Sequence, residues 1–193
     1  SVASRGLGDV YKRQGGVELG AKLTISGHPG SGTSTLVDGL CRSLNWQKLN
    51  GGQVFRDMAD ERGISLEAFA NLCIEDESID QELDALLSET MQSEDSPEIV
   101  ESRLAGWWAH KNGLKCARGW IEVSERVRAT RVVNREGGSI DEQLNLIKQR
   151  MESDNERYER FYDIDIGSRE PYTCIIESDD LGIEEVVSRV LEH

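Results

Sequence analysis

The sequence predicts an α/β domain in which a parallel β-sheet is flanked by helices. Two observations carry this prediction. The stretch 22–44 contains a short apolar strand, a glycine-rich turn and an amphipathic helix, and further apolar segments alternate with helical segments along the chain. In parallel sheets of this kind, ligands bind at the carboxyl ends of the strands. Residues that directly follow the predicted strands are therefore the first candidates for a functional site.

Length and charge narrow the class of protein. The chain of 193 residues suits one α/β domain. Acidic residues outnumber basic residues 36 to 22, and the formal net charge is −14, so we expect neither a nucleic-acid partner nor binding to a membrane surface. No apolar run approaches the ~18 residues that span a membrane. The cysteines are far apart and lack zinc-site spacing, which is typical of a soluble cytoplasmic protein: Cys41, Cys73, Cys116 and Cys174.

Both ends of the chain differ from its middle. Residues 1–20 are rich in glycine and mixed charge and show no periodicity, so we expect a flexible or non-native leader, followed by a single domain over residues 21–193. The final Leu191-Glu192-His193 could likewise be foreign to the domain.

The glycine-rich turn after the first strand is the strongest candidate site. Closely spaced Gly27, Gly30 and Gly32 let backbone N–H groups turn toward phosphate oxygens, and the following helix adds the positive end of its dipole. Ser34 stands where a hydroxyl would meet Mg²⁺, but Thr33 occupies the lysine position of the pattern G-x-x-x-x-G-K-[ST]. A glycine-rich turn without any ligand therefore remains the alternative.

The elements that follow are predicted from periodicity and turn signals. A second strand at 47–49 ends at Asn50-Gly51-Gly52. Three short helices then form a small cap on the sheet: 53–62, with Gly63 as its C′ residue, a helix beginning near Ser65, and 78–91, with Ile79, Leu83, Leu86 and Leu87 on one face. A strand at 98–101 ends in a carboxylate, and another lies within 114–123.

The last third of the chain is predicted to contain a helical hairpin and one more strand. A helix at 124–133 is separated by Gly137-Gly138 from a helix that starts at the capping box of Ser139 and runs toward Tyr162. A strand at 173–176 and a helix at 183–191 complete the domain.

Arginines are the candidate cations of the site. Arg56 and Arg103 follow predicted strand ends and could point into the crevice, where a second phosphate-bearing substrate would need them. Surface ion pairing is the alternative. A second set, at helical spacing on the two arms of the hairpin, would line a lid that closes over transferring phosphates: Arg128, Arg131, Arg135, Arg150 and Arg157. The alternative is a solvated helix whose arginines face glutamates.

Two other features are assigned to structure. His28 has no partner in the sequence and is interpreted as a loop side chain more readily than as a base. Trp107 and Trp108 are interpreted as core residues.

The chain resembles the archaeal type of cytidylate kinase, a branch of the nucleoside monophosphate kinases, from about Lys22 to about Leu191. The resemblance rests on the stretches ISGHPGSGTST, GGQVFRDMADERGISLEAF, IDQELD, VESRLAGWWA, REGGSIDEQ and ERYERFYDIDI. In that family threonine or lysine occurs at the position of Thr33. The stretch after Asp165, IGSREPYTCIIES, departs from the family, although Tyr172 could keep its aromatic position.

The resemblance implies a fold and a reaction. The fold would be that of P-loop nucleoside triphosphate hydrolases, with inserted nucleoside-monophosphate-binding helices at about 52–93 and a lid at about 134–165. A monomeric cytoplasmic enzyme would transfer the γ-phosphate of ATP to CMP, with dCMP as a second acceptor, and would need Mg²⁺.

The resemblance also implies roles for individual residues. ATP phosphates would be bound by Gly27, His28, Pro29, Gly30, Ser31, Gly32, Thr33, Ser34 and Thr35, with Ser34 on the metal. CMP would be bound by Gly52, Arg56 and Arg103, and its amino group by Asp80 and Asp84, because a carboxylate can accept from the N4 donor that uracil lacks. The catalytic lid residues would be Arg131, Arg135, Arg150 and Arg157. The alternatives are a nucleotide-binding module without transferase activity and a small-molecule kinase with another acceptor.

Overall fold

The computed structural model describes residues 20–193, so nearly all of the predicted leader lies outside the described residues. A five-stranded parallel sheet has the order β2-β3-β1-β4-β5. Its strands are β1 Leu23–Gly27, β2 Lys48–Asn50, β3 Ile99–Glu101, β4 Ala117–Glu122 and β5 Cys174–Glu177. In the central strand, Leu23 is in register with Ile99 of β3 and Ala117 of β4. The predicted parallel α/β sheet is confirmed.

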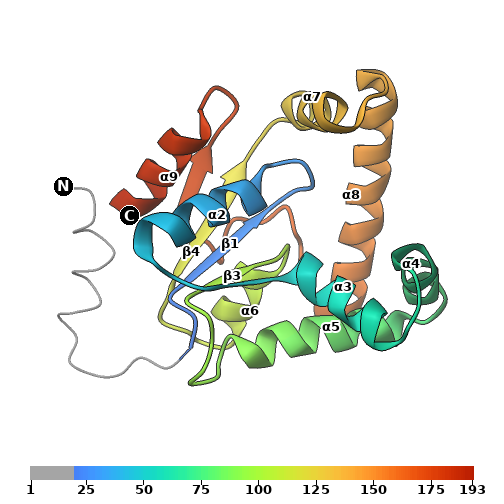
Figure 1. Ribbon diagram of the computed structural model, residues 1–193, viewed down its shortest axis with the longest axis horizontal. Helices are drawn as coiled ribbons and strands as arrows, with labels where there is room; N and C mark the ends of the chain where they lie inside the picture. The colour runs from blue at the N-terminus through green and yellow to red at the C-terminus, as the bar shows by residue number, and fades with distance from the viewer. Residues whose placement is uncertain (1–19) are drawn as a thin grey trace.

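Helices cover both faces of the sheet (Figure 1). Alternation along the strands separates two cores: Ile25 and Ile121 face α2 (Thr33–Leu44) and α9 (Ile183–Glu192), whereas Val100 and Trp120 face α6 (Ala105–Lys111). Trp107 and Trp108 of α6 are buried in the second core, as predicted.

The predicted helical cap consists of α3 (Gly51–Glu61), α4 (Leu66–Glu75) and α5 (Glu77–Thr90), which bury a core of their own. Two details of the prediction are wrong. Gly51 and Gly52 form the first turn of α3 and do not precede it, because the Asn50 side chain caps the helix by accepting from Gln53 N. Leu86 is 43% exposed and lies outside the core of the cap, which Ile79, Leu83 and Leu87 of the same predicted face join.

The predicted helical hairpin is formed by α7 (Glu125–Glu136) and α8 (Ile140–Tyr162). Gly137 and Gly138 between them have φ values of 84° and 95°, which glycine adopts readily. Ser139 caps α8 by accepting from Glu142 N at 3.2 Å. In Figure 1, α8 runs from α7 to the cap helices. No helix between residues 20 and 193 is long and apolar enough to cross a membrane.

Candidate functional site

The predicted strand, loop and helix are confirmed at the carboxyl end of β1. The strand ends at Gly27, and α2 begins at Thr33. Gly30 and Gly32 have left-handed φ values of 82° and 81°, so the shape of the loop depends on glycine at both positions. At Gly30, an added Cβ would also approach Arg128 Cβ to 3.1 Å.

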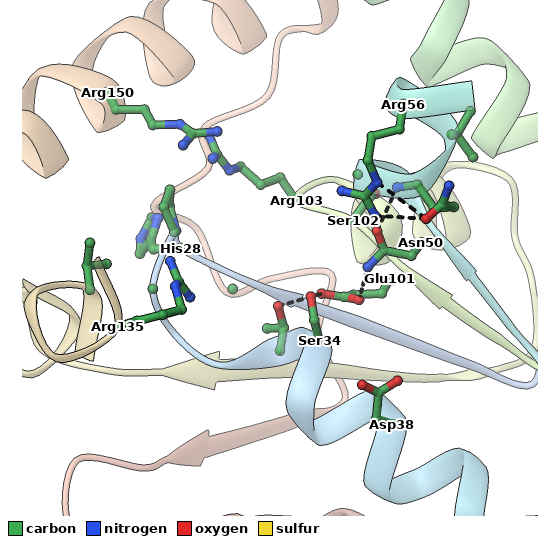
Figure 2. Close-up of a pocket in the computed structure, with 18 of the residues that line it drawn as sticks. His28, Ser34, Asp38, Asn50, Arg56, Glu101, Ser102, Arg103, Arg135 and Arg150 are labelled. Atoms are coloured by element: carbon green, nitrogen blue, oxygen red, sulfur yellow. Dashed lines mark hydrogen bonds between the residues drawn. The ribbon is translucent and has the colours of Figure 1, made fainter. Parts of the chain in front are cut away.

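A cavity of about 1070 Å³ opens above this loop and collects residues from the ends of three strands. The loop contributes one wall, and Glu101 and Ser102 lie at the end of β3. Several predicted residues line this cavity together: Gly27, His28, Pro29, Gly30, Thr33, Ser34, Gly52, Arg56, Arg103, Arg135 and Arg150. The tertiary structure thus brings together segments that are more than a hundred residues apart (Figure 2).

A second cavity, of about 850 Å³, lies between α8 and the cap helices. It contains Asp80, Asp84 and Arg157 and has Phe55 and Leu66 in its apolar wall. The residues that line both this cavity and the one above the loop are Gly52, Arg56, Ser102, Arg103 and Arg150. Three arginines therefore stand where the two cavities meet, and we call this place the junction.

A third cavity, of about 490 Å³, lies on the other side of the loop. Its walls include Arg131 of α7 and the segment that joins β5 to α9, with Leu181 and Ile183. Ser31, Gly32 and Thr35 of the loop line this cavity and not the one above the loop. Sequence reasoning missed the β5–α9 segment, which carries no glycine motif or cation cluster.

Glu101 organises the loop and is the main residue that the sequence analysis left without a role. It is 6% exposed, and its Oε1 accepts from Thr33 Oγ1 at 2.6 Å and from Ser34 Oγ at 2.9 Å. Its Oε2 accepts from the Asn50 amide. Thr33, in the lysine position, is therefore bound to an acid. The sequence feature that could have identified Glu101 is its position as a carboxylate at the end of a predicted strand.

The junction has an excess of positive charge. Arg103 and Arg150 extend their guanidinium groups toward each other (Figure 2). The pKa of Arg103 is lowered to about 10, mainly by burial; the nearby charge of Arg150 contributes to the lowering, and Tyr158 opposes it. Arg56 hydrogen-bonds to Gln53 at 2.9 Å. Within the described part of the chain, neither Arg56 nor Arg150 has a carboxylate partner, so the junction is suited to an anion.

The arginines of α7 face the loop in different ways. Arg128 is 1% exposed and donates to Val123 O and Pro29 O at 3.1 and 3.2 Å. It therefore supports the loop from inside the protein, and the predictions of a lid-lining or a solvated side chain are both wrong for this residue. Arg131 donates to Ser31 O and Ser178 O, both at 3.0 Å. Arg135 lies at the mouth of the cavity above the loop and pairs with the neighbouring Glu136.

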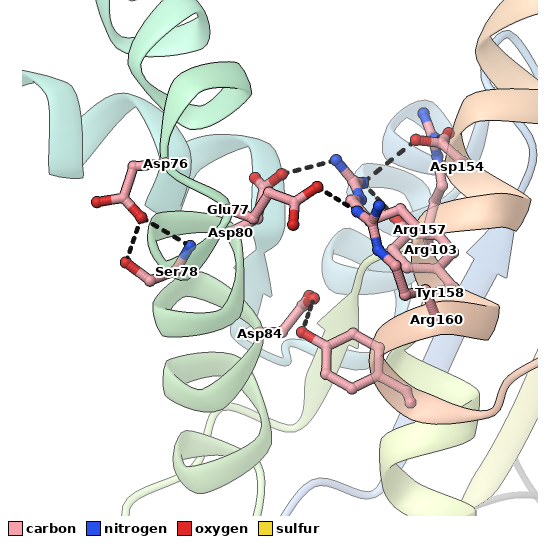
Figure 3. A network of polar contacts seen from close by, with 11 residues as sticks. Asp76, Glu77, Ser78, Asp80, Asp84, Arg103, Asp154, Arg157, Tyr158 and Arg160 are labelled. Carbon is pink, nitrogen blue, oxygen red and sulfur yellow. Dashed lines mark hydrogen bonds and ion pairs between the residues drawn. The ribbon is translucent and has the colours of Figure 1, made fainter.

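Arg157 is separated from the other predicted lid arginines. It donates to Asp80 Oδ2 at 2.7 Å and to Asp154 Oδ1 at 3.2 Å, and so faces the cap helices (Figure 3). Asp84 accepts from Tyr162 OH at 2.8 Å. Burial raises the pKa of Asp84 to about 6, although the Tyr162 hydrogen bond and the Arg157 charge oppose the rise.

His28 is held neutral. Burial and the charges of Arg128 and Arg169 lower its pKa to about 4. Its ring packs edge-on against Trp120, with centroids 4.9 Å apart. The guanidinium of Arg169 lies 4.1 Å from the Trp120 ring, so the chain segment that departs from the expected pattern contacts the loop through this stack.

Comparisons with known proteins found similar sequences and a similar fold. A family model described as an AAA domain matches residues 26–157. A cytidylate kinase from Natronomonas pharaonis is 38% identical over 168 residues, covering 86% of each chain. A cytidylate kinase from Methanospirillum hungatei is 35% identical over 166 residues, covering 86% of this chain and 91% of the relative. A solved shikimate kinase from Bacteroides thetaiotaomicron shares the fold, with a TM-score of 0.56 at 16% identity over 89% of this chain and 96% of that one.

Proposed function

The chain belongs to the cytidylate kinase family, and from this premise we propose that it transfers the γ-phosphate of ATP to CMP, giving ADP and CDP, with dCMP as a second acceptor. The observation that carries the proposal is the junction of two cavities at an arginine cluster. A kinase that joins two phosphate-bearing substrates needs a site for each and a place where their phosphates meet.

ATP, the phosphoryl donor, binds on the side of the junction that the glycine loop lines. Backbone N–H groups of residues 27–35, except Pro29, which has none, hold the β- and γ-phosphates at the N-terminus of α2. The base of ATP enters the 490 Å³ cavity, where Leu181 and Ile183 offer apolar contact and Arg131 offers a flat cation.

Ser34 and Glu101 suit Mg²⁺. Ser34 Oγ and Glu101 Oε1 lie 2.9 Å apart at the cavity wall, and both are oxygen ligands of the kind that Mg²⁺ prefers. Mg²⁺ is usually held by one or two protein oxygens, the rest of its shell being water and phosphate, and residues 20–193 contain no cluster of three or more ligating side chains. When bound, the ion would neutralise charge on the β- and γ-phosphates.

CMP, the phosphoryl acceptor, binds in the cavity between α8 and the cap helices. Arg56 and Arg103 bind the CMP phosphate, and Gly52 lets the backbone of α3 approach it. Asp84 accepts from the amino group of cytosine, since within the described residues its carboxylate accepts one hydrogen bond, from Tyr162, and keeps free lone pairs. Asp80 is paired with Arg157 and supports this wall.

Transfer between two phosphates requires positioning and charge neutralisation more than a base. Arg103 and Arg150 at the junction, with Arg135 at the cavity mouth, neutralise the charge that develops on the transferred group. The neutral His28 is not needed as a base. We also propose a monomer working in a reducing cytoplasm, where the four cysteines would stay free thiols as they are in this structure.

A coupled assay of ADP release with CMP, dCMP, UMP and AMP tests the proposal. We expect the highest kcat/KM for CMP; turnover of AMP above that of CMP would refute the assignment of the base. Arg103→Ala should raise the KM for CMP about 10- to 100-fold, because a charge-assisted contact contributes about 1.5–3 kcal/mol. Arg126→Ala, an exposed arginine of α7, serves as the control.

The alternative of a nucleotide-binding module without transferase activity makes a different prediction. Calorimetry would then show tight ATP binding and no CMP binding. Turnover of an unrelated acceptor alone would favour a small-molecule kinase.

A further inference from the structure

Asp154 is a buried carboxylate at the acceptor side of the junction. It lies in the middle of α8, is 8% exposed, and lines the cavity between α8 and the cap helices. It pairs with two guanidinium groups from different parts of the chain: Arg103, which follows β3, and Arg157, one turn further along α8 (Figure 3).

The neighbouring charges show what Asp154 offsets. The charges of Arg150 and Arg157 both lower the pKa of Arg103, so both cations repel the Arg103 guanidinium. A buried carboxylate is strongly destabilising unless it is paired with a cation. The Asp154 side chain is 11% exposed, and the side chain of its partner Arg103 is 17% exposed. Among the described residues, Asp154 is the one carboxylate that pairs with Arg103; Asp80 contacts Arg157 alone.

We propose that Asp154 is a positioning residue that fixes the Arg103 guanidinium at the junction, in the orientation required to hold the acceptor phosphate during transfer. This inference rests on the proposed function. In this proposal Asp154 acts through Arg103. Because Asp154 belongs to α8, which also carries Arg150 one turn earlier, the same contact sets the position of this part of α8 relative to the acceptor phosphate.

Asp154→Asn tests the proposal, since it removes the charge and keeps the shape. We expect kcat/KM for CMP to fall at least about tenfold while the KM for ATP changes less than about twofold, because the 490 Å³ cavity proposed for the base of ATP lies on the other side of the loop from the junction. Glu152→Gln is the matched control: it removes the same charge from an exposed position of the same helix. It should leave both parameters unchanged.

A double-mutant cycle separates positioning from a merely structural role. In an Arg103→Ala background, Asp154→Asn should change kcat/KM for CMP less than about threefold, because its effect passes through the missing guanidinium. An equal loss in both backgrounds would overturn the inference. If the Asn variant does not fold, Asp154→Glu replaces it, since one extra methylene displaces the carboxylate and its effect must also vanish without Arg103.

The same measurements distinguish the two levels of the argument. No turnover of CMP by the wild-type protein would overturn the proposed function and this inference with it. Wild-type turnover together with an unaffected Asn variant would overturn this inference alone.

Discussion

Replacing Asp84 with asparagine should stabilise the protein at alkaline pH. The carboxyl group of Asp84 is mostly buried between α5 and α8, and burial raises its pKa from an ordinary value of 3.8 to about 6. Well below pH 3.8 the group is protonated in both the folded and the unfolded chain. Between pH 4 and pH 6 the unfolded chain loses this proton first, so the stability of the folded state falls as pH rises through this window and stays lower above it.

The size of the effect follows from the shift in pKa. A shift of about two units corresponds to about 3 kcal/mol, at about 1.4 kcal/mol per unit. Asparagine has nearly the same shape, can still accept from Tyr162 OH, and has no charge to bury. Asp84→Asn should therefore raise the free energy of unfolding by up to about 3 kcal/mol at pH 8 and change it little at pH 4. For a domain of this size, the gain at pH 8 is roughly 6–12 °C in Tm.

Thermal unfolding of both proteins from pH 4 to pH 8 measures this difference. Asp80→Asn is the control with the opposite sign, because it breaks the ion pair with Arg157 at 2.7 Å and should lower Tm at pH 8. A gain for Asp84→Asn that is the same at both ends of the pH range, or no gain at pH 8, would refute the reasoning. The stabilised variant should also discriminate less well between CMP and UMP, as expected where a site retains a costly charge for recognition.

Three further predictions concern the loop and the core. Glu101→Gln should lower kcat at least about tenfold and weaken the dependence of the rate on Mg²⁺, because the carboxylate that bonds Thr33 and Ser34 becomes a neutral amide. Thr33→Lys should change the KM for ATP or kcat less than about fivefold, since arginines already supply cationic charge around the loop. Gly106→Ala should destabilise the protein by about 1–3 kcal/mol, because its Cβ would lie 2.3 Å from Tyr172 Cε1.

Each of these has a contrary outcome. Full activity and unchanged Mg²⁺ dependence in Glu101→Gln would remove Glu101 from the metal site. A large gain in Thr33→Lys would mean that the arginines do not compensate for the missing lysine. An unchanged Tm for Gly106→Ala would mean that the Tyr172 ring moves freely.

The sequence by itself determined the parallel α/β sheet, the glycine loop and the two arginines at strand ends. These features are local: positive φ at Gly30 and Gly32 requires glycine, and hydrophobic periodicity separates strands from helices. In a parallel sheet the carboxyl ends of the strands meet at one edge, so Arg56 and Arg103 could be placed in one crevice from their positions alone.

Only the tertiary structure decided what each arginine of the hairpin does. Arg128, Arg131 and Arg157 look alike in sequence, yet one braces the loop from a buried position, one joins the loop to the β5–α9 segment, and one faces the cap helices. The physical reason is that helical spacing fixes the side of a helix on which a residue lies but not the element that covers that side. For the same reason the partners of Glu101 and Asp154 appear only when the segments that bear them are packed together.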